Sequence, residues 1–369
     1  NKKIKNFKNQ IELINFPIDL VLSMHLSPHS EAVAFDWAAA VRLLSAFNRH
    51  QNNASPKTVF HAGYPLDIYD PRKPPKASVI FIPGLAIHGR EDRRMRQLAS
   101  ALCAAGLRVI VPDIPSIRSL RVTSGQSHEV RDLVEILVNE SSLVVTENVA
   151  LMSVSFSSVF ALDIARQGSL GTRLKGVGII GGYSDIESVA SFLIKAKRAD
   201  PYGKLIISRS YLLETEPGNS AEGDALKWAV ESSALNTKAL NPLCDLFDLT
   251  DSLQAGIYDR LTDADYCDDF YLKILDHLDN QWSGYRLEGD FPHDMSPVFI
   301  LHGRHDRIIP SGEAKRLAQR FNRQKLPYFL CVSELLTHGN SDISMRKFFE
   351  VYRLLRGFAW FLGQISRAD

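Results

Sequence analysis

Hydrophobic and polar positions alternate in two ways along this chain. Between residues 78 and 180, short continuous apolar runs are separated by stretches in which apolar residues recur every three or four positions. Such runs are typical of buried parallel strands, and the spaced stretches are typical of amphipathic helices. This predicts strands at 79–82, 107–111, 149–152 and 176–180, with helices at 93–105, 130–138 and 157–166. We therefore expect an α/β fold, with a mostly parallel central sheet and helices on both faces.

The alternation resumes near the C-terminus. Strands are predicted at 298–301 and 328–332, and helices at 312–321 and 344–362. At the other end of the chain, 58–64 and 66–69 have the pattern of two short strands joined by a turn. Helical spacing precedes them at 11–25 and 31–47.

Residues 184–295 interrupt the alternation. They show helical spacing without a clear buried strand. The helical spacing is clearest at 186–197, 225–235 and 265–278. An insertion between two sheet segments is expected to cover the carboxyl ends of the strands, where ligands bind in open α/β sheets. The expected organisation is a helical N-terminal extension (1–56), a core (57–183 and 296–369) and a helical cap (184–295).

Composition narrows the class of protein. The 369 residues are 45% hydrophobic and 23% charged with a net charge of +1, which gives no reason to expect a nucleic-acid surface. The four cysteines lack the paired spacing of zinc ligands. If they are free thiols, they favour a cytoplasmic location. Because the sequence starts at Asn1 and not at Met, removal of a leader peptide stays an alternative. No apolar run reaches the ~18 residues of a membrane helix.

A serine cluster follows the run at 149–152. A serine at a sharp strand-to-helix turn is a nucleophile elbow, which presents a catalytic hydroxyl above an α/β-hydrolase sheet. Ser155 occupies this position, and the glycines usual two residues before and after it are replaced by Ser153 and Ser157. Serine is among the smallest replacements. The alternative is a polar cluster that caps the following helix.

From about residue 58 to the end, the chain resembles the α/β-hydrolases. The resemblance is carried by the elbow at Ser155, by 81–85, by 299–310, which contains Asp306, and by 336–339, which contains His338. It implies a triad in the chain order that this fold uses, with Ser155 as nucleophile, Asp306 as the acid that orients the imidazole, and His338 as the base. No cofactor and no metal are implied.

An oxyanion hole is expected from two backbone amides, those of Phe156 and Leu85, with Ala86 as an alternative to Leu85. Gly84 would let its loop approach closely. His302 and His305, which flank Asp306, are expected to be structural, and Asp113 is expected to be a turn residue. Asp294 and Glu334 are weaker candidates for the acid.

The expected function is hydrolysis of a carboxylic ester or thioester, with a small-molecule substrate that carries an apolar acyl group. Apolar stretches at 190–193, 205–207 and 211–213 would line the acyl pocket or form the core of the cap. Two alternatives remain: peptide or C–C bond hydrolysis on the same scaffold, and a binding protein that lost catalysis. The oligomeric state and the role of residues 1–56 do not follow from the sequence.

Overall fold

An eight-stranded sheet forms the centre of the protein, in the order β1-β2-β4-β3-β5-β6-β7-β8. The computed structural model describes residues 34–48, 55–235, 242–337, 340–341 and 348–367. The strands are β1 (Lys57–His61), β2 (Tyr64–Tyr69), β3 (Ser78–Ile82), β4 (Arg108–Pro112), β5 (Val149–Val154), β6 (Leu174–Ile180), β7 (Val298–Gly303) and β8 (Tyr328–Ser333). All pairs from β4 to β8 are parallel, and β2 pairs antiparallel with both β1 and β4.

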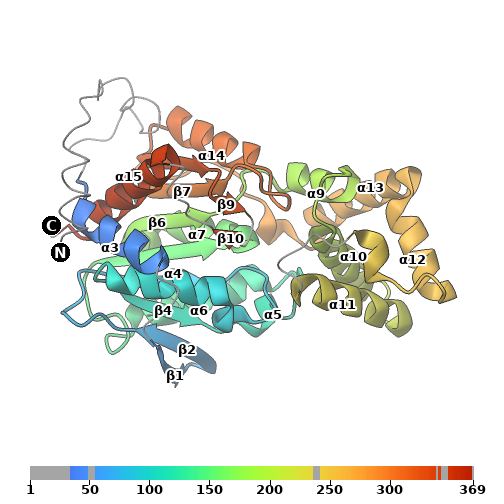
Figure 1. Ribbon diagram of the computed structural model, residues 1–369, viewed down its shortest axis with the longest axis horizontal. Helices are drawn as coiled ribbons and strands as arrows, with labels where there is room; N and C mark the ends of the chain where they lie inside the picture. Colours follow the sequence, from blue (N-terminus) through green and yellow to red (C-terminus); the bar gives the residue numbers. More distant parts are fainter. Residues whose placement is uncertain (1–33, 49–54, 236–241, 338–339, 342–347, 368–369) are drawn as a thin grey trace.

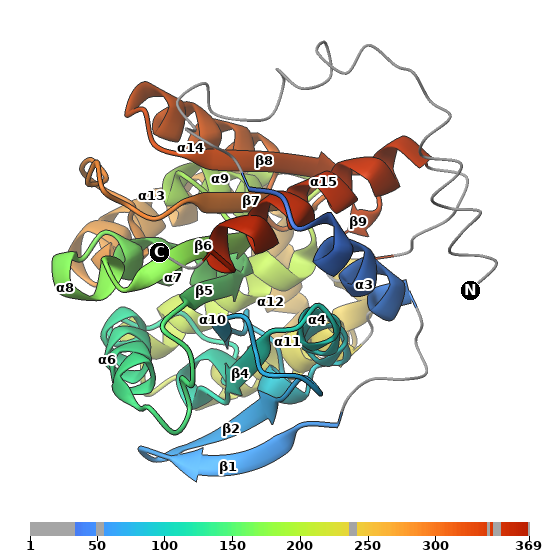
Figure 2. The same cartoon turned by 90° about the vertical axis from the view of Figure 1, so that its left-hand side faces the viewer.

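Alternate residues of the strands belong to two separate apolar cores, one on each face of the sheet. In β3, for example, Ile80 and Ile82 belong to one core, whereas Val79 and Phe81 belong to the other. This explains the continuous apolar runs, because a strand buried on both faces has no polar side. Figure 2 shows the strands from β1 and β2 at the bottom to β8 at the top, between the two helical layers.

Helices cover both faces of the sheet. One layer contains α3 (Trp37–Asn48), α4 (Arg93–Ala104) and α15 (Phe348–Ile365). The other contains α6 (Gln126–Asn139), α7 (Ser158–Ala165) and α14 (Gly312–Arg323). Shorter helical turns are η1 (Gly89–Glu91), α5 (Pro115–Arg118), η2 (Ser155–Ser157) and α8 (Gly168–Gly171). The predicted fold class, a mostly parallel sheet with helices on both faces, is therefore confirmed.

The described part of the predicted N-terminal extension packs on the core. Helix α3 begins at Trp37, later than the helical spacing predicted, and its Ala39, Ala40 and Leu43 are buried against α4 and α15. The backbone amide of Asp36 donates to the carbonyl of Ala359 at 2.8 Å. The helix predicted at 11–25 lies outside the described residues.

Between β6 and β7 the described residues are mainly helical, and we call 186–235 and 242–285 the helical segment. It contains α9 (Ile186–Lys195), α10 (Pro201–Thr215), α11 (Ser220–Leu235), η3 (Leu243–Leu246), α12 (Ser252–Thr262), α13 (Ala264–Asn280) and η4 (Ser283–Tyr285). Three of these were predicted, whereas α10 and α12 were not. The segment extends from one end of the sheet, at the right of Figure 1.

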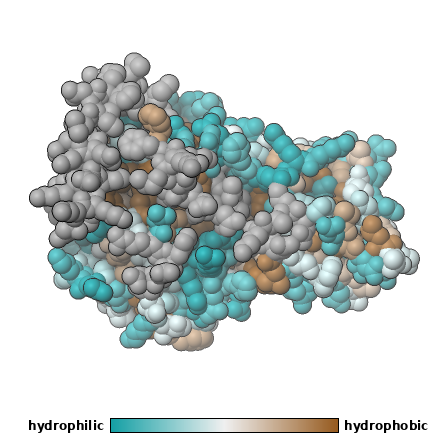
Figure 3. All heavy atoms as spheres, in the orientation of Figure 1, coloured by the Kyte–Doolittle hydropathy of each residue, from teal (hydrophilic) through white to brown (hydrophobic). Residues whose placement is uncertain are grey.

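The predicted apolar stretches of this segment have different environments. Leu205, Ile206 and Ile207 are buried in the larger core, which supports the interpretation that they stabilise the segment itself. Tyr211 and Leu212, one turn further along α10, line a cavity. On the face seen in Figure 3, hydrophilic and hydrophobic side chains intermix over the helical segment. Among the described helices, none has the length and apolar character that crossing a bilayer requires.

Candidate active site

Ser155 lies at the turn between β5 and α7, where the sequence predicted an elbow. Its φ is 58°, in the left-handed region that residues other than glycine rarely adopt. Such a conformation costs roughly 1–3 kcal/mol and persists only where the surrounding structure holds it. Ser155 is 6% exposed and stands directly after the last residue of β5. The turn therefore has the strained strand-to-helix geometry that an elbow needs.

The two serines that replace the usual glycines fit this turn in different ways. Ser153 is fully buried in β5, paired with Ile82 of β3, and its hydroxyl has no partner among the described residues. Ser157 is also buried, and its hydroxyl donates to the carbonyl of Pro83 at 2.7 Å. Ser157 thus joins the turn to the loop that follows β3.

That loop lies tightly against the turn at Ser155. A Cβ on Gly84 would stand 3.1 Å from the carbonyl oxygen of Val154 and 3.4 Å from Cβ of Ser155. The expected close approach of Gly84 is therefore present. Leu85 follows Gly84 in this loop. In the described part of the chain, the backbone amide of Leu85 donates to no acceptor. An unpaired backbone donor beside a serine is available to a developing oxyanion.

The carbonyl of Leu85 is held from the other side. The hydroxyl of Tyr202, on α10, donates to this oxygen at 2.9 Å. Burial raises the pKa of the Tyr202 phenol, so that it remains a donor at any pH at which the protein is studied. No sequence pattern indicated this bond, because it joins residues 117 positions apart.

Asp306 lies in the turn that follows β7, and it is 8% exposed. One of its carboxylate oxygens accepts hydrogen bonds from the amides of Ile308 and Ile309, at 2.8 and 2.9 Å. These bonds fix the orientation of the carboxylate. Its second oxygen lies 3.6 Å from Nε2 of His302.

His302 is fully buried, and its Nε2 lies 2.8 Å from the carbonyl of Ile309, to which it donates. It therefore supports the turn that carries Asp306, as its predicted structural role requires. His305 is exposed. The weaker candidates for the acid, Asp294 and Glu334, are exposed as well, and Glu334 pairs with Arg304.

His338, the predicted base, lies outside the described residues. Residues 336–337 and 340–341, before and after positions 338–339, are described. Strand β9 (Leu336–Thr337) pairs antiparallel with β10 (Asn340–Ser341), and β9 contacts β7, the strand that Asp306 follows. The assignment of His338 as the base therefore stays a prediction from the sequence.

Asp113 directly follows β4, as expected of a turn residue. It is also buried beside two arginines, at 3.1 Å from Nη1 of Arg118 and 3.9 Å from Nε of Arg90. Arg90 also pairs at 2.5 Å with Asp67, which is fully buried. This charged cluster anchors the end of the loop that carries Leu85, and the sequence pattern did not indicate it.

The helical segment is bonded to both loops at this end of the sheet. Besides the Tyr202 bond to the loop after β3, the amide of Asp200 donates to the carbonyl of Arg307 at 2.8 Å. In return, Nε of Arg307 donates to the carbonyl of Arg198 at 2.8 Å. Residues 198–202 therefore connect the loop beside Ser155 with the turn that carries Asp306.

Comparison with known proteins gives distant relatives. No family model matches the chain. A UDP-2,3-diacylglucosamine hydrolase of Shewanella oneidensis is 28% identical over 130 residues, which is 31% of this chain and 51% of that protein. The protein of the same name from Shewanella sp. strain MR-7 is 27% identical over 131 residues, with the same coverage. The matches thus span about half the length of these curated relatives.

Several solved hydrolases resemble the chain at low identity. A puromycin-hydrolyzing peptidase of Mycobacterium tuberculosis has a TM-score of 0.47 and 17% identity, covering 86% of this chain and 41% of that one. Lipase A of Candida antarctica in its closed state has a TM-score of 0.46 and 14% identity, covering 83% and 76%. A sugar hydrolase of Lactococcus lactis has a TM-score of 0.44 and 14% identity, covering 84% and 98%.

The sheet itself defines the fold. A mostly parallel eight-stranded sheet with helices on both faces, and a strand that turns into a helix at a serine with positive φ, constitute an α/β-hydrolase fold.

Proposed function

We propose that this protein is a serine hydrolase that cleaves carboxylic esters or thioesters through a triad of Ser155, His338 and Asp306. The observation that carries the proposal is the left-handed backbone of Ser155 at the end of β5, beside a loop whose Leu85 amide has no acceptor in the described part of the chain. Strain of this kind at a serine is typical of a nucleophile that must be exposed to substrate.

The proposed reaction has two stages. Oγ of Ser155 attacks the acyl carbonyl carbon while His338 takes the hydroxyl proton, and the carbonyl oxygen becomes an oxyanion bound by the amides of Phe156 and Leu85. The tetrahedral intermediate collapses, the bond to the alcohol or thiol breaks, and His338 protonates the leaving group. Water activated by His338 then attacks the acyl-enzyme and releases the carboxylic acid, with Ser155 protonated again.

Asp306 serves as the acid of the triad because its position and surroundings suit that role. Its turn follows β7, at the same edge of the parallel sheet as the end of β5, from which only β6 separates it. Hydrogen bonds from the backbone amides of Ile308 and Ile309 hold its carboxylate in one orientation. A fixed, charged carboxylate keeps an imidazole in the required tautomer and stabilises it once protonated.

The helical segment is proposed to act as the cap over this site. Residues 198–202 are bonded to the loop beside Ser155 and to the turn of Asp306. A cap attached at both loops would shield the site from bulk solvent while still admitting the attacking water, and it would help to form the substrate pocket. An ester or thioester is proposed over an amide because alcohols and thiols leave more readily than amines.

The alternative of an inactive binding protein rested on Ser153 and Ser157. Both are buried without displacing Ser155 from its strained conformation, and the hydroxyl of Ser157 adds a bond to Pro83. Their presence therefore gives no reason to expect loss of catalysis.

Labelling with a fluorophosphonate tests the nucleophile. We expect the wild-type protein to take one label, Ser155→Ala to take none, and the matched control Ser158→Ala, three residues away, to label as the wild type does. A wild type without label, or an equally labelled Ser155→Ala, would refute the proposal. Turnover of p-nitrophenyl esters and acyl-CoAs of graded chain length, compared with a peptide p-nitroanilide, would then separate the ester and thioester function from peptidase activity.

A further inference from the structure

A cavity of about 350 Å³ lies within the helical segment, between α10, α11, α12 and α13. This volume falls in the range of roughly 300–1,000 Å³ that is usual for small-molecule sites. Its lining contains none of the residues proposed for catalysis or for the oxyanion hole. The cavity is therefore distinct from the site at Ser155.

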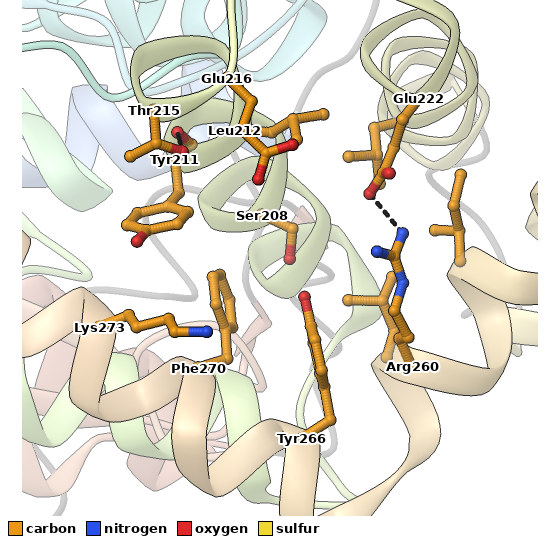
Figure 4. A pocket seen from close by; sticks show the side chains of 13 residues that line it. Ser208, Tyr211, Leu212, Thr215, Glu216, Glu222, Arg260, Tyr266, Phe270 and Lys273 are labelled. Carbon is orange, nitrogen blue, oxygen red and sulfur yellow. Dashed lines mark hydrogen bonds and ion pairs between the residues drawn. The ribbon is translucent and has the colours of Figure 1, made fainter. Parts of the chain in front are cut away.

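Aromatic rings form one wall of the cavity (Figure 4). The rings of Tyr266 and Phe270 stack with centroids 6.0 Å apart, and Tyr211 meets the edge of Phe270 at 5.6 Å. Aliphatic side chains from α11 and α12, Leu226 and Leu261, also line the cavity. A planar ring that enters this space would contact aromatic surfaces in the offset and edge geometries that such rings prefer.

Ser208 places a buried hydroxyl in this cavity, and we call the part of the cavity next to it the inner end. Its side chain is 8% exposed, and among the described residues no partner is bonded to its Oγ. In Figure 4 this oxygen points into the cavity, toward the hydroxyl of Tyr266. A buried hydroxyl without a partner costs roughly 1–3 kcal/mol, so a ligand atom that bonds it would recover this free energy.

The charged side chains at the cavity largely balance one another. Arg260 pairs with Glu222 at 2.6 Å and lies over the ring of Tyr266, 5.9 Å from its centroid. Lys273 pairs with Asp269 at 2.7 Å, and Glu216 is exposed at the rim. Because both cations of the described lining are paired, an anionic ligand is not favoured at the inner end.

We infer that this cavity binds a neutral, single-ring aromatic molecule whose polar substituent forms a hydrogen bond with Ser208. The ring packs between the aromatic wall and the aliphatic side chains, and the substituent, a hydroxyl or an amine, reaches the inner end. This is a binding site additional to the proposed esterase site, and no bond is made or broken in it.

Fluorine NMR titration of the full chain tests the inference. The two probes are 4-fluorophenol and fluorobenzene, which differ only by the hydroxyl. We expect Ser208→Ala to weaken binding of 4-fluorophenol by about fivefold, as the loss of one hydrogen bond predicts, and to leave fluorobenzene unchanged. Ser208→Leu should abolish binding of both probes, because the larger side chain occupies the inner end. Tyr202→Phe, on the same helix but away from the cavity, is the matched control and should bind both probes normally.

Blocking Ser155 with a fluorophosphonate separates this site from the proposed catalytic one. Binding of 4-fluorophenol should be unchanged in the blocked protein and in Ser155→Ala, whether or not Ser155 proves to be a nucleophile. The inference is overturned if 4-fluorophenol does not bind at millimolar concentration, if blocking Ser155 displaces it, or if Ser208→Ala binds both probes as the wild type does. Should Ser208→Leu fail to fold, the comparison of the two probes in Ser208→Ala decides the question.

Discussion

The hydroxyl of Tyr202 donates a 2.9 Å hydrogen bond to the carbonyl of Leu85. This bond fixes the plane of the peptide that precedes Ala86 and limits the movement of the whole loop after β3. The same loop receives the hydroxyl of Ser157 at Pro83, so two side chains from different elements restrain it. The amide proposed to bind the oxyanion therefore belongs to a loop that is held before substrate arrives, as electrostatic preorganisation requires.

Tyr202→Phe should lower kcat by about tenfold and leave KM within about twofold. Without the hydrogen bond the loop can move, and the Leu85 amide can leave the position of an oxyanion-hole donor, which stabilises the transition state by ~3 kcal/mol. Steady-state kinetics on a p-nitrophenyl ester measure both constants. Tyr211→Phe, on the same helix but facing the cavity, is the matched control and should keep the wild-type kcat. Equal values of kcat for Tyr202→Phe and the wild type would show that the bond only attaches the helical segment.

The local features of the site were accessible from the sequence. Ser155 and Asp306 each follow a short apolar run, and the end of such a run marks the end of a buried strand. Their proximity along one sheet edge then follows from the parallel pairing of β5, β6 and β7. The sequence also indicated that serine could occupy the positions of the elbow glycines, because its side chain is small.

The contacts between distant segments could not be predicted in this way. The bond from Tyr202 to Leu85 and the pairing of Arg90 with Asp67 depend on how helices and loops pack, and no pattern of neighbouring residues encodes them. Helices α10 and α12 were missed for a related reason. Helix α10 is apolar on several sides, and α12 buries only Ile257 and Leu261, so neither shows a strong helical period.

Ser153 and Ser157 make a matched pair for a test of the turn. Ser157→Ala should destabilise the protein by about 1 kcal/mol, because the buried carbonyl of Pro83 loses its donor. Ser153→Ala should be neutral or stabilising by up to about 1 kcal/mol, because it removes a buried hydroxyl that has no partner in the described part of the chain. Urea denaturation of both variants measures the difference. A loss of stability in Ser153→Ala as large as that in Ser157→Ala would contradict this account.

Asp306→Asn should reduce kcat by about 10³–10⁴-fold, because the amide cannot stabilise a protonated imidazole or hold it in the required tautomer. The fold should be retained, since an amide oxygen can still accept from Ile308 and Ile309. Glu334→Gln, at an exposed carboxylate, is the control and should keep full activity. Circular dichroism checks the fold, and a p-nitrophenyl ester reports the activity. If Glu334→Gln lost activity and Asp306→Asn kept it, Glu334 would be the acid.

Alkaline pH should destabilise the protein through the buried thiol of Cys331. Burial raises the pKa of this thiol to about 12, and its Sγ lies 3.7 Å from the carbonyl of Arg353, to which it donates. In the unfolded chain a thiol loses its proton near pH ~8.5. Above that pH the unfolded state binds fewer protons than the folded state, so stability falls as the pH rises toward 12.

The contribution of Cys331 is fully present below pH ~8.5, and about 2 kcal/mol of it should be lost by pH ~10. Urea denaturation at a series of pH values measures the free energy of unfolding. Cys331→Ala should show a shallower fall with pH than the wild type, although it is less stable at neutral pH because it leaves a cavity. Cys244→Ala, at a half-buried site, should retain the wild-type slope. Identical slopes for Cys331→Ala and the wild type would mean that other groups cause the alkaline loss, among them Tyr69, whose pKa burial raises to about 12.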